Sequence, residues 1–175
     1  MKGEVPGPKC EGLVFIALGS NLGDTRGNVT RAMERLEELS AAPLRRSSLW
    51  VSQPVDCPPG SPQFVNAVVT LVPLAKETPE SLLGKLQALE REFGRQPKRV
   101  LNEPRPLDLD VVAFGTETRA TAMLTLPHSR ASQRAFVLQP LAELAPQLVL
   151  PGQSRTAAEL LGSLPPGSLC RKLER

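Results

Sequence analysis

The chain has 175 residues, of which 41% are hydrophobic and 22% are charged, and its formal net charge is +3. This length and composition predict a globular protein with a sizeable core. The small net charge does not indicate a nucleic-acid-binding protein, and an aromatic content of 3% leaves few stacking platforms for single strands.

The first segment, residues 1–12, contains a lysine but no hydrophobic run after it, so it is expected to be a flexible leader and not a signal peptide. No run in the chain reaches membrane-spanning length. The three cysteines, Cys10, Cys57 and Cys170, are far apart and match no metal-site spacing. They are expected to be free thiols in the reducing cytoplasm, in a protein with no nucleic-acid or membrane partner.

Residues 13–175 are expected to form one domain of alternating strands and helices. Two helix starts are marked, one by Asp24 and one by Thr78 followed by Pro79. Four prolines and a glycine in 53–63 indicate a long irregular loop. In chain order, the periodicity predicts a strand in 13–24, a helix in 24–39, strands at 45–52 and 64–72, a helix at 78–94, a strand at 107–114, a mostly helical stretch in 123–146 and a short helix at 156–164.

This order, β-α-β-β-α-β, predicts an α+β fold with a ferredoxin-like core. In such a core, the helices pack on one face of an antiparallel sheet. The helices expected in 123–146 and 156–164 follow the last strand of this order, so they are a helical C-terminal addition to the core.

Two carboxylates stand in the otherwise apolar strand at 107–114. Asp108 and Asp110 are two residues apart, so both side chains point to the same face of the strand. Two carboxylates this close repel each other unless a cation lies between them, and Mg²⁺ binds such groups together with phosphate oxygens. The alternative is that both aspartates lie on the solvent face of a half-exposed strand.

A basic segment precedes these aspartates. It carries Arg91, Arg95, Lys98, Arg99 and Arg105. A cationic loop beside a metal-binding carboxylate pair suits phosphoryl transfer, in which the protein positions the transferred group and neutralises its charge. A solvated surface loop is the alternative explanation.

Three further features are ambiguous from their residues alone. His128 is the only histidine and is compatible with a structural role or, beside Arg130 and Arg134, with phosphate binding. Asn66 lies in an apolar strand and offers the donor and acceptor that the edge of a heterocycle needs, or it is a satisfied buried amide. The glycines of 19–23 fit a tight turn better than a phosphate-binding loop.

The motifs resemble, in order and spacing, those of the 6-hydroxymethyl-7,8-dihydropterin pyrophosphokinase family. The similarity covers roughly residues 13–150. It rests on the segments "FIALGSNLGD", "FVNAVV", "LQALEREFGR", "PRPLDLDVVAFG" and "LTLPHSRASQRAFVLQPLAELAP".

The resemblance implies an enzyme that transfers pyrophosphate from ATP to the hydroxymethyl group of the reduced pterin and releases AMP, in folate biosynthesis. It also implies a ferredoxin-like fold. Asp108 and Asp110 match the family's metal ligands, which hold two Mg²⁺ ions between the ATP phosphates and the pterin hydroxyl.

The resemblance also implies roles for other residues. Arg95 and Arg105 match arginines that bind the transferred phosphates and count with the two aspartates as catalytic residues. The residues expected to bind ATP are Gln87, Glu90, Lys98, Arg99, Thr125, His128 and Arg134. The residues expected to bind the pterin are Ser52, Pro54, Val55, Phe64, Asn66 and Phe136.

The chain departs from the family pattern in and near the basic loop. Pro97 and Leu101 replace common arginines, Asn102 replaces a common tryptophan, and Ser129 replaces a common tyrosine. Lys98 and Arg99 carry positive charge at shifted positions in the same loop, and the sequence leaves open whether they replace the missing arginines. An active enzyme with altered loop contacts is therefore expected.

Two other functions remain open at this level. One is a non-catalytic pterin- or nucleotide-binding domain on the same fold. The other is a different metal-dependent nucleotidyl enzyme, because ferredoxin-like sheets also carry acidic metal pairs in such proteins. The expected partners are small molecules, ATP and the pterin, and the chain is expected to be a monomer.

Overall fold

The structure is a computed structural model that describes residues 11–174. Most of the expected leader, with Cys10, and Arg175 lie outside this range. The elements are the strands β1 (Val14–Ser20), β2 (Arg45–Arg46), β3 (Trp50–Ser52), β4 (Phe64–Leu71), β5 (Asp108–Phe114), β6 (Arg119–Ala120), β7 (Thr125–Leu126) and β8 (Arg171–Lys172), the helices α1 (Thr25–Leu36), α2 (Pro79–Glu92), α3 (Ala135–Leu144) and α4 (Ala157–Gly162), and 3-10 turns at Glu37–Leu39, Ala131–Gln133 and Pro166–Ser168. None of the helices described in this range has the length and apolar character needed to cross a membrane.

The main sheet is antiparallel and has the order β5-β1-β4-β3-β8, with β2 also paired to β4. Helix α1 connects β1 to β2 and β3, which both pair with β4, and α2 connects β4 to β5. This arrangement is the ferredoxin-like β-α-β-β-α-β core, so the predicted fold class is confirmed. In the centre, Ala17 of β1 pairs with Val68 of β4 on one side and with Asp110 of β5 on the other.

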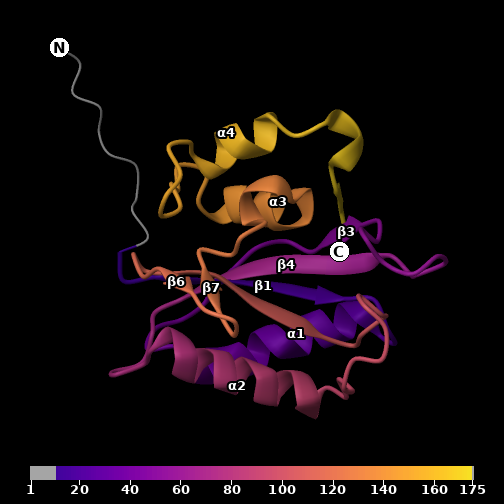
Figure 1. The fold of residues 1–175 in the computed structure, drawn as a ribbon, viewed down its shortest axis with the longest axis horizontal. Helices are drawn as coiled ribbons and strands as arrows, with labels where there is room; N and C mark the ends of the chain where they lie inside the picture. The colour runs from indigo at the N-terminus through magenta and orange to yellow at the C-terminus, as the bar shows by residue number, and fades with distance from the viewer. Residues whose placement is uncertain (1–10, 175) are drawn as a thin grey trace.

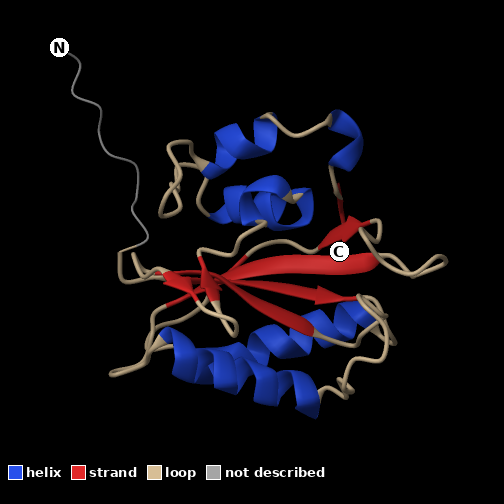
Figure 2. Cartoon of the chain, viewed as in Figure 1, coloured by secondary structure: helices blue, strands red, loops and turns tan. Residues whose placement is uncertain are grey.

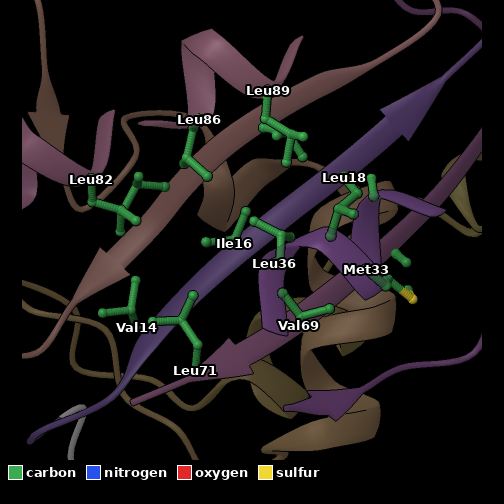
Figure 3. Close-up of a cluster of buried hydrophobic side chains, with 14 of the residues drawn as sticks. Val14, Ile16, Leu18, Met33, Leu36, Val69, Leu71, Leu82, Leu86 and Leu89 are labelled. Atoms are coloured by element: carbon green, nitrogen blue, oxygen red, sulfur yellow. The ribbon is translucent and has the colours of Figure 1, made fainter. Parts of the chain in front are cut away.

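Helices cover both faces of the sheet (Figure 1 and Figure 2). Successive β1 side chains point to opposite faces, so Ile16 packs in a cluster with α1 and α2 that includes Leu36 and Leu86 (Figure 3). Phe15 belongs to the cluster on the other face, with Leu138 of α3. The expected packing on one face therefore describes α1 and α2, while the C-terminal helices cover the opposite face.

Both predicted helix caps are present. The Asp24 carboxylate accepts a hydrogen bond from the Gly27 backbone N–H at 3.0 Å, before α1. The Thr78 hydroxyl accepts one from the Ser81 N–H at 3.1 Å, before α2. These local bonds satisfy backbone donors that have no partner inside the helix.

The sequence predicts one continuous strand at 45–52, which is wrong, because the structure has two separate strands there, β2 and β3. Between them, the Ser47 backbone N–H donates to the Val68 carbonyl oxygen, and the Ser47 hydroxyl accepts from the Val68 backbone N–H. The next backbone N–H, that of Ser48, donates to the Glu143 carboxylate of α3 at 3.1 Å instead of to a strand. Side-chain acceptors therefore replace part of the ladder.

Candidate active site

The two aspartates lie at the start of β5, on the face covered by α3. Their neighbours Leu107 and Leu109 are buried in the cluster under α1 and α2. Asp108 and Asp110 instead line a pocket together with Phe136 from α3. The alternating side chains of one strand thus bury leucines on one face and place two carboxylates in a recess on the other.

Asp108 is held by two arginines. Arg95 Nη1 donates to Asp108 Oδ1 at 2.6 Å, and Arg105 Nη2 donates to Asp108 Oδ2 at 3.0 Å. Burial opposes the charged form of this carboxyl, but the attraction of Arg105 and Arg95 outweighs that effect and lowers the pKa of Asp108. Asp108 is therefore ionised at neutral pH.

Glu90 reaches this cluster from α2. One of its oxygens, Oε1, accepts hydrogen bonds from Arg95 Nη1 at 2.6 Å and from the Leu109 backbone N–H at 2.8 Å. The second bond satisfies a donor on the free edge of β5. Burial raises the pKa of Glu90 in spite of these bonds. Glu90 therefore connects α2 to the edge of the sheet and orients Arg95 toward Asp108.

Asp110 has a different environment from its neighbour. No side chain or backbone group in residues 11–174 donates a hydrogen bond to its carboxylate. Burial, with the nearby charges of Asp108 and Glu90, raises the pKa of Asp110 to about 7. A half-buried carboxyl without donors is well suited to receive a cation, which supplies the charge that the protein does not.

The far side of the pocket carries an amide and two aromatic rings. Asn66 Nδ2 donates to Ser52 Oγ at 2.8 Å and to the Trp50 carbonyl oxygen at 3.3 Å. These bonds use its amide hydrogens and leave the oxygen for a ligand donor. The rings of Phe64 and Phe136 also line the pocket, so it combines flat apolar walls with a fixed acceptor.

An arginine guanidinium lies over each of these rings. The guanidinium carbon of Arg105 lies 5.3 Å from the centroid of the Phe64 ring, and that of Arg134 lies 5.3 Å from the centroid of the Phe136 ring. Both separations are within the range of cation–π attraction. The positive charges are therefore fixed beside the aromatic walls and near the two aspartates.

Asn21, in the turn after β1, holds Arg105 in place. Its side-chain oxygen accepts from the Arg105 backbone N–H at 2.9 Å, and its own backbone N–H donates to the Arg105 carbonyl at 3.1 Å. Asn21 is 1% exposed. Sequence analysis attributes 19–23 to a tight turn and misses this role, for which an asparagine among glycines was the only signal.

A basic cleft adjoins the pocket. Arg95, Lys98 and Arg99 line it, and Arg105 and Asn102 line both the cleft and the pocket. Cations in the cleft and carboxylates in the pocket thus meet around Asp108. This arrangement can bind a polyphosphate in the cleft with its reacting end beside a flat ligand in the pocket.

A model of the family 7,8-dihydro-6-hydroxymethylpterin-pyrophosphokinase (HPPK) matches residues 15–146. The chain belongs to the HPPK family. This result agrees with the resemblance seen in the sequence.

Individual relatives support the same assignment. A 2-amino-4-hydroxy-6-hydroxymethyldihydropteridine pyrophosphokinase of Pseudomonas aeruginosa is 41% identical over 153 residues, which cover 87% of this chain and 91% of the relative. A protein with the same description from Synechocystis is 36% identical and covers 87% of this chain and 76% of the relative.

A solved structure with a similar fold is a Plasmodium falciparum HPPK-DHPS protein with pterin and p-hydroxybenzoate. Its TM-score is 0.64 at 12% identity, over 86% of this chain. This chain spans 43% of that solved chain, and at this identity the comparison concerns the fold alone.

Most residues that the HPPK resemblance implicated lie around the pocket or the cleft. Those that line the pocket are Ser52, Val55, Phe64, Asn66, Arg105, Asp108, Asp110, Arg134 and Phe136. Those that line the cleft are Arg95, Lys98, Arg99 and, again, Arg105. Glu90 contacts the cluster through Arg95. Pocket-lining residues that the sequence did not indicate include Ala17, Gly19, Gln53 and Cys57.

The other residues that the resemblance implicated line neither the pocket nor the cleft. Pro54 lies between two lining residues, but does not line the pocket itself. Gln87 of α2 and Thr125 of β7 are exposed and line neither the pocket nor the cleft. His128 lines a separate hollow with Ser129, and burial, with the charge of Arg134, lowers its pKa.

The oxygens of Asp108 and Asp110 suit a hard cation whose other coordination positions are open to water or phosphate. Within residues 11–174, no group of three or more His, Cys, Asp or Glu side chains forms a complete metal site. Asp108 and Asp110 supply only carboxylate oxygens, and Mg²⁺ commonly binds one or two carboxylates while phosphate oxygens and water complete its octahedron.

Proposed function

We propose that the pocket and the basic cleft are where this chain, a pyrophosphokinase of folate biosynthesis, transfers the diphosphate of ATP to 6-hydroxymethyl-7,8-dihydropterin. The pterin hydroxyl oxygen bonds to the β-phosphorus of ATP, the bond from that phosphorus to the oxygen of AMP breaks, and the hydroxyl proton is lost. The observation that carries the assignment of the site is the pair of pocket carboxylates, one bound by two arginines and the other without a hydrogen-bond donor.

Asp108 and Asp110 would hold Mg²⁺, for which we propose two ions. When bound, the metal neutralises phosphate charge and stabilises the attacking and leaving oxygens. Both Asp108 oxygens are engaged by arginines in this structure. We therefore propose that Arg95 and Arg105 exchange this carboxylate for ATP phosphates, which frees Asp108 for the metal while the arginines remain near the transferred group.

The other cations extend this phosphate site. Lys98 and Arg99 line the cleft with Arg95 and would bind the outer phosphates. Arg134 lines the pocket with both aspartates, and the charge of Asp108 acts on the pKa of both Arg134 and His128. We propose ATP contacts for these four residues, while Gln87 and Thr125 need a rearrangement to reach the nucleotide.

The pterin would lie between the rings of Phe64 and Phe136, with the Asn66 oxygen accepting a hydrogen bond from its edge. Ser52 supports this role, because its hydroxyl accepts from Asn66 Nδ2, while the Trp50 carbonyl oxygen, which can only accept, fixes which atom of the amide faces the pocket. Gly19 contributes by its lack of a side chain, since a Cβ there would lie 3.5 Å from Asn66 Oδ1 and from the Phe64 ring. Larger side chains at position 19 would fill the pterin pocket. The loop around Pro54 and Val55 would cover its opening.

The deciding experiment is to incubate the protein with ATP, Mg²⁺ and 6-hydroxymethyl-7,8-dihydropterin and to follow the nucleotide products. AMP that forms only when the pterin is present supports the proposed reaction. Release of pyrophosphate would indicate a nucleotidyl enzyme instead. Pterin binding without any product would indicate a binding domain. A monomer in a reducing cytoplasm remains a prediction, which light scattering of the purified protein would test for the oligomeric state.

A further inference from the structure

A row of opposed residues runs across the main sheet at the site. Asp108, Gly19, Asn66, Trp50 and Lys172 lie opposite one another, in this order, on β5, β1, β4, β3 and β8. Directly opposite residues of an antiparallel sheet point to the same face. Here it is the face covered by α3, where Asp108 and Asn66 line the pocket. The row therefore places the Trp50 side chain next to the amide that is proposed to bind the pterin edge.

Glu143, near the end of α3, holds the Trp50 side chain. Its Oε2 accepts from Trp50 Nε1 at 3.0 Å and from the Ser48 backbone N–H at 3.1 Å, and its Oε1 accepts from the Ser48 hydroxyl at 2.6 Å. Lys172 Nζ lies 3.4 Å from Glu143 Oε1 and 5.7 Å from the centroid of the Trp50 ring. Burial opposes the charged form of Glu143, but the bonds from Ser48 and Trp50 outweigh that effect and lower its pKa. One ionised carboxylate thus connects α3 to both β3 and β8.

The same helix carries an aromatic wall of the pocket. Phe136 and Glu143 are about two turns apart in α3, so they lie on the same face of the helix. Phe136 lines the pocket, and Glu143 contacts β3 through Trp50. The Glu143 carboxylate therefore helps to fix the separation between the Phe136 wall and the strand beside Asn66.

Strand β3 carries both acceptors that orient the Asn66 amide, the Trp50 carbonyl oxygen and the Ser52 hydroxyl. The strand is only three residues long, and its outer neighbour β8 has two residues. Ladders this short provide few backbone bonds and belong to the less stable parts of a fold. The bonds to Glu143 add side-chain anchors where the ladder itself is weak.

We propose that Glu143 is a positioning residue for the pterin. It fixes Trp50 and the start of β3 against α3, so that the Trp50 carbonyl and the Ser52 hydroxyl hold the Asn66 amide with its oxygen toward the pocket. Glu143 does not line the pocket itself, so it acts through Asn66 and not by contact with the ligand. This inference rests on the proposed function for the identity of the ligand, whereas the hold on Asn66 is testable in the free protein.

Three substitutions separate this role from a general loss of stability. Glu143→Ala removes both acceptor oxygens, and Glu143→Gln is the milder change, because it keeps one of them and nearly the same size. The matched control is Glu37→Ala. Glu37 Oε1 accepts from Arg46 Nη2 at 2.6 Å and so also connects a helical turn to a strand of the same sheet, but neither residue lines the pocket or the cleft.

The first measurement is NMR of the Asn66 side-chain amide in the protein without ligands, with its signals assigned by their absence in Asn66→Ala. These signals should shift and broaden in Glu143→Ala, do so less in Glu143→Gln, and stay unchanged in Glu37→Ala. The fluorescence of Trp50, the only tryptophan of the chain, should shift in Glu143→Ala as well, because its indole N–H loses its acceptor. Unchanged Asn66 signals in Glu143→Ala would overturn the proposal. If Glu143→Ala does not fold, Glu143→Gln decides by the same criterion.

The second measurement is pterin affinity in the presence of α,β-methylene-ATP and Mg²⁺. Glu143→Ala should weaken pterin binding about threefold to tenfold, as expected when one side chain must be immobilised during binding, and should leave nucleotide affinity close to wild type. In an Asn66→Ala background, Glu143→Ala should have almost no further effect on pterin affinity. An equal loss in both backgrounds, or no loss in either, would overturn the proposal. If wild type forms no AMP in the assay above, the proposed function fails, and the Asn66 signals still decide whether Glu143 positions the amide.

Discussion

In the protein without metal, the ionised Asp110 carboxylate should lower the free energy of unfolding, although the same carboxylate is proposed to bind the metal. Its pKa is about 7 in the folded protein against an ordinary value of 3.8, so the fold favours the neutral carboxyl. Between these two values the folded state binds more protons than the unfolded state, and stability falls as the pH rises. The full penalty is present above about pH 7 and disappears below about pH 4.

The shift of about 3 pKa units corresponds to at most about 4 kcal/mol. Asp110 keeps partial access to water in the pocket, so we expect roughly half of this value, about 2 kcal/mol, at pH 8. The linkage relation gives about half of the pH 8 effect at pH 5.5. Asp110→Asn removes the charge, so it should raise Tm by about 4–8 °C at pH 8 and by less at pH 5.5.

Asp108→Asn is the matched control on the same strand. Its pKa is lowered by Arg105 and Arg95, so its charge stabilises the fold at neutral pH. That stability is present above the unfolded pKa and is lost as the pH falls through the lower folded value. Asp108→Asn should therefore lower Tm at pH 8, because it leaves the partly buried Arg105 guanidinium without its carboxylate and Arg95 with Glu90 alone.

The assay is thermal unfolding of both variants and wild type in EDTA at pH 5.5 and pH 8, followed by AMP formation with saturating Mg²⁺. Both variants should lose activity by several orders of magnitude, since each loses a proposed ligand for the metal at the phosphoryl-transfer site. Their stabilities should change in opposite directions. A Tm gain for Asp110→Asn that is equal at the two pH values, or a Tm loss at pH 8, would refute the electrostatic reasoning. Near-normal turnover of either variant would refute the metal assignment.

Three further outcomes are expected. Asn66→Ala should weaken pterin binding by about 1–3 kcal/mol and ATP binding much less, and equal losses in separate calorimetric titrations would show that Asn66 is only structural. Arg95→Ala should lower kcat more than it raises KM, because its phosphate contact matters most once the site has closed; steady-state kinetics at saturating Mg²⁺ test this, and a change in KM alone would contradict it. Residues 95–104, with few apolar anchors, should exchange hydrogen freely without ligands and become protected when α,β-methylene-ATP and pterin are both bound; protection already present in the free enzyme would argue against a moving lid.

Sequence alone determined the local features of this protein. Asp24 and Thr78 start their helices through bonds to residues three positions away, so neighbours in the chain are sufficient to predict them. The period of two in a strand places Asp108 and Asp110 on one face whatever packs there. The order of strands and helices, with the rule that short connections join antiparallel neighbours, leads to the ferredoxin-like core.

Tertiary structure decided which distant residues contact these local features. The two aspartates share a face, but only folding gives Asp108 two arginines and leaves Asp110 without a donor, which separates their pKa values. Asn21 and Arg105 are 84 positions apart, and no spacing rule indicates that they bond. Strand β8 pairs with β3 across more than a hundred residues and has only two residues of its own to signal it. These contacts depend on the packing of the whole sheet and its helices, because their energies arise only when distant segments are brought together.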